Sequence, residues 1–117
     1  MYRCVGLNEA HDIEEYGGFR SHSAAAFEAG KWFATTYENA VRWGRRMPPI
    51  NRPRSFRIAS IRVSASILAT LDFHDRLDGI GPAYFVPRDL LQVMNATGTL
   101  TLDAAIFQED AYHADTA

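Results

Sequence analysis

Residues 30–44 read GKWFATTYENAVRWG, and this stretch organises the rest of the chain. Trp32 and Phe33 are bulky residues that favour strands, so we expect a short strand here. The strand should turn into a helix at Thr35. The Thr35 side chain and Glu38, three residues later, are the pair that a capping box requires. The stretch therefore predicts a strand followed directly by a helix.

A helix that begins at Thr35 would place Thr36, Ala40 and Trp43 on one face. That face would lie beside the aromatic strand, with small residues between the two tryptophans. Such an arrangement can hold a flat ring in a slot. The competing interpretation is that Trp32 and Trp43 are core residues, since aromatic side chains dominate core energetics.

The chain has 117 residues, which suits one folded domain. We expect that domain to span residues 1–107, followed by a polar tail at 108–117. Cys4 is the only cysteine, so no internal disulfide can form and a reducing, cytoplasmic compartment is expected. We find no signal-peptide pattern and no apolar run long enough to cross a membrane, so no membrane association is predicted.

Charge is unevenly distributed, although the formal net charge is only -2. No acidic residue occurs between Glu38 and Asp72, and that segment holds the arginines Arg42, Arg45, Arg46, Arg52, Arg54, Arg57 and Arg62. Such a segment can bind an anion, either a phosphate or a nucleic acid. A solvated arginine-rich loop explains the same pattern equally well.

The remaining elements follow from apolar periodicity and from turn residues. Besides the central strand and helix, we expect strands at 2–6, 56–63, 83–86 and 99–102, helices at 9–16 and 87–95, a short helix starting at Ser64 or Ser66, and loops at 19–29, 45–54 and 72–82. Asn8 should cap the first helix and Gly17 should end it. Short strands and few helices without a Gly-x-Gly-x-x-Gly motif do not suit a classical dinucleotide fold. The pattern predicts a small α+β domain.

Residues 30–44 also carry a resemblance to a known family. The run GKWFA, followed by a helix with Ala40 and Trp43, resembles the second NAD-binding motif of ADP-ribosyltransferases. In the diphtheria-toxin/PARP branch that motif runs Gly-x-Tyr-Phe-Ala, and the helix after it carries a small residue and an aromatic that stacks on nicotinamide. Rifampin ADP-ribosyltransferases have a similar Tyr-Phe-Thr-Ala-Thr and a helix ending in Trp-Gly. The resemblance implies the small split β-sheet ADP-ribosyltransferase fold, with short helices, and NAD as substrate.

The first family motif is similar to the first expected strand. Its aromatic-arginine pair matches Tyr2 and Arg3, so Arg3 would hold the ribose or a phosphate of NAD, and the Cys4 backbone would pair with the nicotinamide amide. Taken alone, Arg3 would be expected to form a surface salt bridge, and it is the pairing with the Trp32 stretch that favours the site. The resemblance thus assigns NAD binding to Tyr2, Arg3, Cys4, Trp32, Phe33, Ala40 and Trp43.

The third family motif has a catalytic Glu at the start of a strand, and here that position is Ala83. Rifampin-type enzymes lack that Glu and use an Asp in a preceding loop. Among Asp72, Asp75 and Asp78 we favour Asp78, because the glycines that follow it allow close approach of the backbone to a ligand. Any one of these aspartates could instead be an ordinary turn residue. His74 is a general-base candidate by residue type.

The chemistry implied is cleavage of the bond between nicotinamide and ribose, which passes through a cationic, oxocarbenium-like transition state. Such an enzyme fixes the ring, holds the ribose and places negative charge near the cation. The resemblance assigns this catalysis to Arg3, Trp32, Asp78 and Ala83, with no metal.

The sequence therefore favours an NAD-dependent ADP-ribosyltransferase-like toxin or effector domain. It would transfer ADP-ribose to a protein or nucleic acid, or hydrolyse NAD, and would have an inhibitory immunity or antitoxin partner. One alternative is an inactive NAD- or ADP-ribose-binding module, because the Glu position is Ala83. Another is an arginine-rich RNA-binding or protein-interaction domain, whose binding should weaken with salt.

Overall fold

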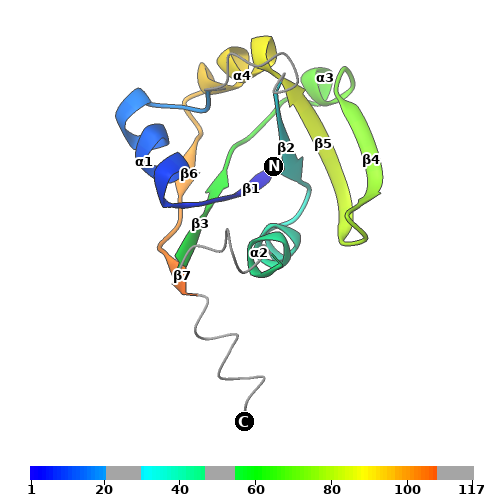
Figure 1. Ribbon diagram of the computed structural model, residues 1–117. Coiled ribbons are helices and arrows are strands. Elements are labelled where there is room, and N and C mark those ends of the chain that lie inside the picture. The colour runs from blue at the N-terminus through cyan, green and yellow to red at the C-terminus, as the bar shows by residue number, and fades with distance from the viewer. Residues whose placement is uncertain (21–29, 47–54, 108–117) are drawn as a thin grey trace.

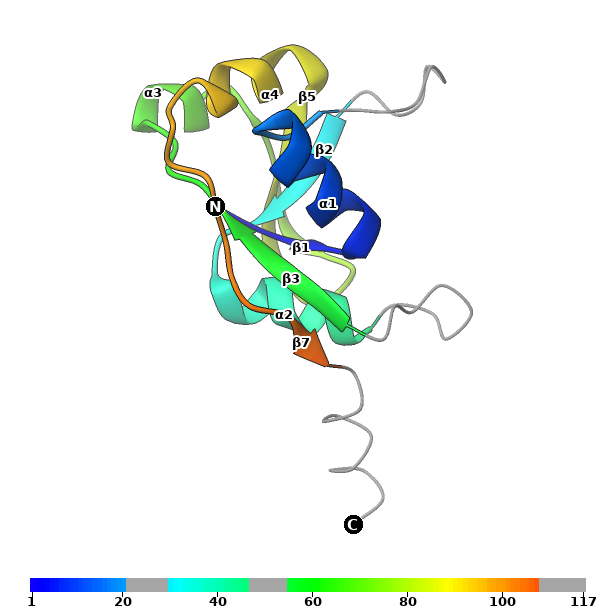
Figure 2. The same cartoon turned by 90° about the vertical axis from the view of Figure 1, so that its left-hand side faces the viewer.

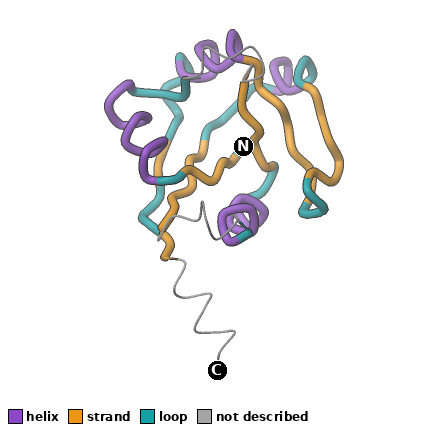
Figure 3. The backbone as a smooth tube through the Cα atoms, in the orientation of Figure 1, coloured by secondary structure: helices purple, strands orange, loops and turns teal. Residues whose placement is uncertain are grey.

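An antiparallel sheet forms the frame of the protein, with helices on both of its faces (Figures 1 and 2). The computed structural model describes residues 1–20, 30–46 and 55–107. In chain order its elements are β1 (Tyr2–Val5), α1 (Leu7–Tyr16), β2 (Gly30–Ala34), α2 (Tyr37–Arg45), β3 (Ser55–Ser60), α3 (Ala65–Leu68), β4 (Asp72–Leu77), β5 (Gly81–Pro87), α4 (Arg88–Asn95), β6 (Thr101–Leu102) and β7 (Ile106–Phe107) (Figure 3). The predicted α+β class is confirmed.

The strands lie in the order β4-β5-β2-β1-β3-β6, and β7 pairs with β3. Neighbouring strands share runs of registered pairs, such as Gly30↔Pro87 to Ala34↔Ala83 between β2 and β5. The junction between β1 and β2 differs, because its only registered pair is Tyr2↔Ala34. Beyond this pair the two central strands diverge, which opens a wedge in the middle of the sheet (Figure 1).

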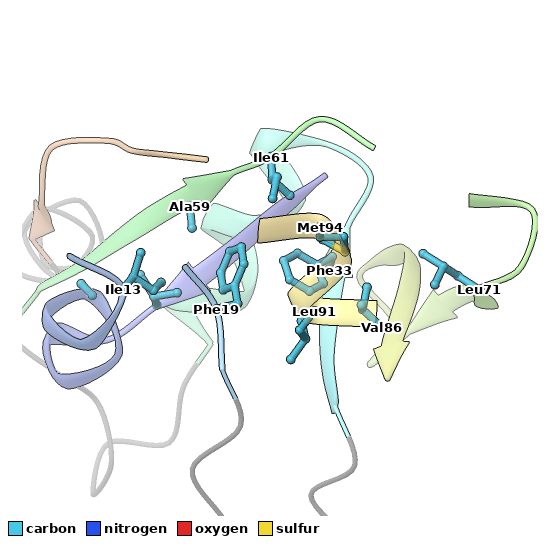
Figure 4. Close-up of a cluster of buried hydrophobic side chains, with 11 residues drawn as sticks. Ile13, Phe19, Phe33, Ala59, Ile61, Leu71, Val86, Leu91 and Met94 are labelled. Atoms are coloured by element: carbon cyan, nitrogen blue, oxygen red, sulfur yellow. The ribbon is translucent and has the colours of Figure 1, made fainter. Parts of the chain in front are cut away.

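The larger core lies between the sheet and helices α1 and α4. Its buried members are Val5, Ala10, Ile13, Phe19, Phe33, Ala59, Ile61, Leu71, Val86, Leu91 and Met94 (Figure 4). A smaller buried cluster, Ala34, Ala40, Phe56 and Ile58, packs on the opposite face beneath α2. Because side chains alternate along a strand, Phe33 enters one core and Ala34 the other. Strand β3 likewise contributes to both clusters, as expected for an interior strand.

The helix termini correct two sequence predictions. Helix α1 begins at Leu7 with Gly6 as its N-cap and no side-chain cap, so the expected Asn8 cap is wrong. Its end at Gly17, with φ 85°, is confirmed. The N-cap of α2 is Thr36, whose side chain accepts a hydrogen bond from the Asn39 amide at 3.2 Å. The expected capping box of Thr35 and Glu38 is therefore wrong, because the helix begins one residue later.

The predicted loop at 72–82 is also wrong, since most of it forms β4, a three-residue turn and the start of β5. Residues 72–76 are all exposed. A strand with no buried face lacks the alternation that marks strands in a sequence. The expected strand at 56–63 ends at Ser60, the strand expected at 99–102 is shortened to β6, and β7 is an additional short strand.

Of the remaining predictions, some are decided by the described residues and others lie outside them. Ser64, rather than Ser66, is the N-cap of α3, and α4 follows Pro87 as expected. Most of the two loops expected at 19–29 and 45–54 lies outside the described residues, as does the tail at 108–117.

Candidate functional site

A cavity of about 280 Å³ occupies the wedge between β1 and β2. Helix α2 and the turn between β4 and β5 complete its wall. It is lined by Tyr2, Arg3, Cys4, Trp32, Phe33, Ala34, Ala40, Trp43, Leu77, Asp78 and Ala83. Every residue to which the sequence analysis assigned NAD binding or catalysis is among them, whereas Asp72, His74 and Asp75 are not.

Small residues create the space for this cavity. Ala83, Ala34 and Tyr2 are consecutive register partners across β5, β2 and β1, so their side chains project from the same face of the sheet. Ala40 lies above that row on α2 and is almost fully buried. Because three alanines meet here, α2 can approach the sheet while a pocket remains beside it.

Arg3 ties together the strands that diverge around the wedge. Its Nε and Nη2 donate to the two carboxylate oxygens of Glu9 at 2.7 and 3.0 Å, and Nη1 donates to the Trp32 carbonyl at 3.0 Å. Lys31 Nζ lies 3.3 Å from the same carboxylate. The salt-bridge alternative for Arg3 is therefore confirmed, and its role toward NAD stays a prediction, although Arg3 also lines the cavity.

Glu9 was not identified from the sequence, although it fixes the orientation of Arg3. Burial raises the pKa of the Glu9 carboxyl, but the hydrogen bonds and charges of Arg3 and Lys31 outweigh burial, and the pKa lies below its usual value. A lowered pKa means that the folded protein holds the Glu9 proton more weakly than the unfolded chain does. This ion pair therefore stabilises the fold above the unfolded pKa of about 4.3, and that stability is lost as the pH falls through the folded pKa.

We expect Glu9→Gln to lower the free energy of unfolding by roughly 1–3 kcal/mol at pH 7, since it removes charge-assisted hydrogen bonds. The difference from the wild type should shrink as the pH falls below the unfolded pKa of about 4.3 and through the lower folded pKa, because Glu9 of the wild type then becomes protonated. Urea unfolding at several pH values measures both effects. Glu15→Gln, an exposed position on the same helix, is the control and should change stability little. A pH-independent difference at Glu9 would contradict the assignment.

The Cys4 thiol is unsuited to act as a nucleophile. Burial raises its pKa to about 12; the charge of Arg3 lowers it and that of Glu9 raises it. The thiol therefore stays protonated at neutral pH. The role that the resemblance implies for Cys4 involves its backbone and not its thiol, and it stays a prediction.

Trp43 positions Asp78 at the mouth of the cavity. The indole Nε1 donates to Oδ2 of Asp78 at 2.9 Å. Asp78 has a left-handed backbone conformation with φ 56°, which Asp tolerates better than most residues. Arg46 donates to the Asp78 carbonyl and Arg42 to the Ile80 carbonyl, both at 3.3 Å. Helix α2 thus fixes the turn that presents this carboxylate.

Neither tryptophan is a buried core residue. Trp32 is 37% exposed and packs against Phe85, with ring centroids 5.2 Å apart. Trp43 is half-buried and projects from α2. The two indoles come from different elements and both line the cavity, so the core interpretation of Trp32 is wrong.

Ala83 has no acidic side chain, and neither of its register partners is a carboxylate. It is buried, and its register partners are Ala34 on β2 and His74 on β4. The His74 side chain is exposed, and its Nδ1 accepts a hydrogen bond from the Arg76 amide at 3.2 Å. Among the residues that line the cavity, Asp78 is thus the carboxylate available for chemistry.

Part of the arginine-rich segment has structural partners. Arg42 and Arg46 bind carbonyls of the β4–β5 turn. Arg57 binds the Asp103 carbonyl at 2.7 Å and the Glu14 carboxylate. Arg52 and Arg54 lie outside the described residues. These contacts account for three of the arginines without a nucleic acid.

No group of side chains suited to a metal ion occurs within residues 1–20, 30–46 and 55–107. None of the helices in those ranges is both long and apolar enough to span a bilayer. The fold and cavity define a small α+β domain with a candidate ligand site. Comparison of the chain with known protein families, curated proteins and solved structures gives no match.

Proposed function

We propose that this chain is an NAD-dependent ADP-ribosyltransferase-like domain. It cleaves the bond between nicotinamide and ribose, and transfers ADP-ribose to a macromolecule or to water. A toxin or effector role, with an inhibitory partner protein, is part of this proposal. So are the cytoplasmic location and the split-sheet fold of that family.

One observation carries the proposal. Nine residues were assigned to the site from separate sequence motifs, eight by the resemblance and Asp78 also by the glycines that follow it, and all nine line one cavity. They come from β1, β2, α2, the β4–β5 turn and β5. The cavity also lies where the central strands diverge, which suits a ligand inserted between the two halves of a split sheet.

The residues have complementary roles in this proposal. Trp43 stacks on one face of the nicotinamide ring, and Trp32 packs against the other face of the ring. The Cys4 backbone pairs with the carboxamide of nicotinamide. Arg3 keeps the N–H groups that Glu9 and Trp32 do not use, and these can hold a ribose hydroxyl. Asp78 places negative charge near the developing cation. The cavity volume is near the lower end of the ~300–1,000 Å³ typical of ligand pockets, so it suits the nicotinamide and ribose, with the rest of NAD outside.

The second candidate is a module that binds NAD or ADP-ribose without turnover. It is favoured by the buried Ala83 at the usual Glu position. In this case Asp78 would only position the ligand. The arginine-rich RNA-binding alternative stays a prediction, with its support reduced by the internal partners of Arg42, Arg46 and Arg57.

A thermal-shift titration with NAD and with nicotinamide tests the proposal. Both ligands should raise the melting temperature, because they bind only the folded state. Trp43→Ala and Trp32→Ala should each weaken binding about tenfold or more, since stacking on an aromatic side chain contributes ~1–3 kcal/mol. Phe73→Ala removes an exposed aromatic residue of β4 outside the cavity and should leave binding unchanged.

Labelled NAD then separates the two candidates. Release of nicotinamide, or labelling of a macromolecule, supports the transferase. Binding without either product supports the inactive module. Absence of binding by both ligands would contradict the transferase, and absence of binding by ADP-ribose as well would contradict the inactive module.

A further inference from the structure

A row of register partners extends from the cavity across β1 to the β6 edge of the described sheet. Ala34, Tyr2, Ser60 and Thr101 are consecutive partners across β2, β1, β3 and β6. Register partners project from the same face of a sheet, so all four side chains lie on the face that carries the cavity. Beyond Tyr2, the hydroxyl residues Ser60 and Thr101 occupy positions that alanines occupy inside the cavity.

A groove of about 730 Å³ lies on this far side of Tyr2. Of the described residues that line either space, only Tyr2 lines both the groove and the cavity. The Tyr2 ring meets the ring of Tyr37, the first residue of α2, edge to face with centroids 6.1 Å apart. The groove is therefore a neighbour of the cavity and has a wall of its own.

Arg62 has the only charged side chain among the described residues that line the groove. Its backbone is held in place, because its amide donates to Thr99 Oγ1 at 3.0 Å and Thr97 Oγ1 lies 2.8 Å from that oxygen. Arg3 and Arg57 each form an ion pair with a glutamate. Within the part of the chain that the structure describes, Arg62 forms no ion pair. Its guanidinium is thus available to an anionic ligand.

The rest of the lining indicates the kind of anion. Ser60 and Thr101 supply hydroxyl donors near Arg62, and hydroxyls together with a guanidinium suit the oxygens of a phosphate. Met1 and Val63 supply apolar surface in the same groove. The groove volume falls within the ~300–1,000 Å³ of ligand pockets, which is more than a single inorganic anion needs. A ligand that joins a phosphate to a flat, less polar group fits this lining.

We propose that the groove is a second binding site, for a mononucleotide. Arg62 binds the terminal phosphate, since its planar fork matches phosphate oxygens. The hydroxyls of Ser60 and Thr101 donate to the same phosphate, and the base packs on the apolar part of the groove. This inference goes beyond the proposed function and does not depend on what the cavity binds.

Amide NMR spectra of the full chain, recorded during titrations, locate the site directly. AMP should shift the amides of Ser60, Arg62 and Thr101. Adenosine, which lacks the phosphate, and inorganic phosphate, which lacks the base, should each bind at least about tenfold more weakly than AMP. The dinucleoside monophosphate ApA should also bind more weakly, because its only phosphate is an internal diester with a single charge.

Arg62→Gln should weaken AMP binding about tenfold or more, because it removes a charge-assisted contact to the phosphate. It should leave adenosine binding unchanged. The bond to Thr99 uses the backbone amide of residue 62 and can persist in the variant. Arg76→Gln is the matched control, since Arg76 is an exposed arginine of β4 that does not line the groove. It should bind AMP as the wild type does.

Shifts confined to amides away from the groove, or an unchanged AMP affinity in Arg62→Gln, would overturn the site. Binding of inorganic phosphate or ApA as tight as that of AMP would overturn the mononucleotide assignment. Nicotinamide should leave the amides of Ser60, Arg62 and Thr101 unshifted. Failure of AMP to bind in the groove would leave the proposed function standing, and failure of nicotinamide to bind would leave the groove standing.

Discussion

Under the proposed function, replacing Arg3 with alanine is expected to lower the rate of NAD cleavage about a hundredfold to a thousandfold. Removal of one preorganised donor from an active site has an effect of this size. Arg3 also holds β1 against the Trp32 carbonyl at 3.0 Å, at the point where the strands have no registered pair. Its loss would therefore displace the walls of the cavity, and small displacements alone can reduce rates about a hundredfold.

Arg3→Lys separates the charge from the geometry. Lysine can pair with Glu9, but it has no planar fork that could bind both carboxylate oxygens and the Trp32 carbonyl at once. We expect this variant to recover most of the melting temperature lost in Arg3→Ala, and still to cleave NAD at least about tenfold more slowly than the wild type. Nicotinamide release and thermal melting measure the two effects. A wild-type rate in Arg3→Lys would contradict the geometric role.

Replacing Phe33 with alanine should have the largest effect on stability, a loss of about 3–5 kcal/mol in the free energy of unfolding. Phe33 is 1% exposed and belongs to the larger core. Its ring meets Phe19 edge to face, with centroids 5.0 Å apart and planes at 90°. The substitution would leave a cavity between the sheet and helices α1 and α4. Such a loss is a large fraction of the ~5–15 kcal/mol by which domains are usually stable.

Phe73→Ala is the control for this prediction. Phe73 is 53% exposed and touches Tyr84 at a centroid distance of 5.0 Å, on the outer strand β4. Its removal should lower stability by less than about 1 kcal/mol, because little buried surface is lost. Urea unfolding of both variants gives the comparison. Equal losses would mean that the core does not depend on the face of β2 that carries Phe33.

The sequence predicted elements best where a single segment contains its own signal. Residues 30–44 contain a bulky strand and a helix-forming run, and both elements occur there. Gly17 ends α1 because only a left-handed residue completes that type of helix end. The start of α2 was off by one residue, since Thr35 and Thr36 are equally good caps by residue type.

Strand β4 and the role of Glu9 could not be predicted in this way. Strand β4 has no buried face along residues 72–76, so no alternation marks it. Glu9 pairs with Arg3 and Lys31, which lie on two different strands. The distance between Glu9 and Lys31 along the chain gives no indication that they meet. The site residues were named by resemblance, and their convergence on one cavity depended on how the strands pair.

The sequence by itself determined the α+β class, most of the helices and the end of α1 at Gly17, because these depend on residues close together in the chain. Only the tertiary structure shows why Gly44 and Gly30 have no room for a side chain. A Cβ at Gly44 would lie 2.6 Å from the buried Phe56 ring, and one at Gly30 would lie 2.1 Å from the Val86 carbonyl. The wedge between β1 and β2 also depends on the tertiary structure, because it forms where the pairing of these two strands stops. Contacts between distant segments set both features, and no local pattern encodes them.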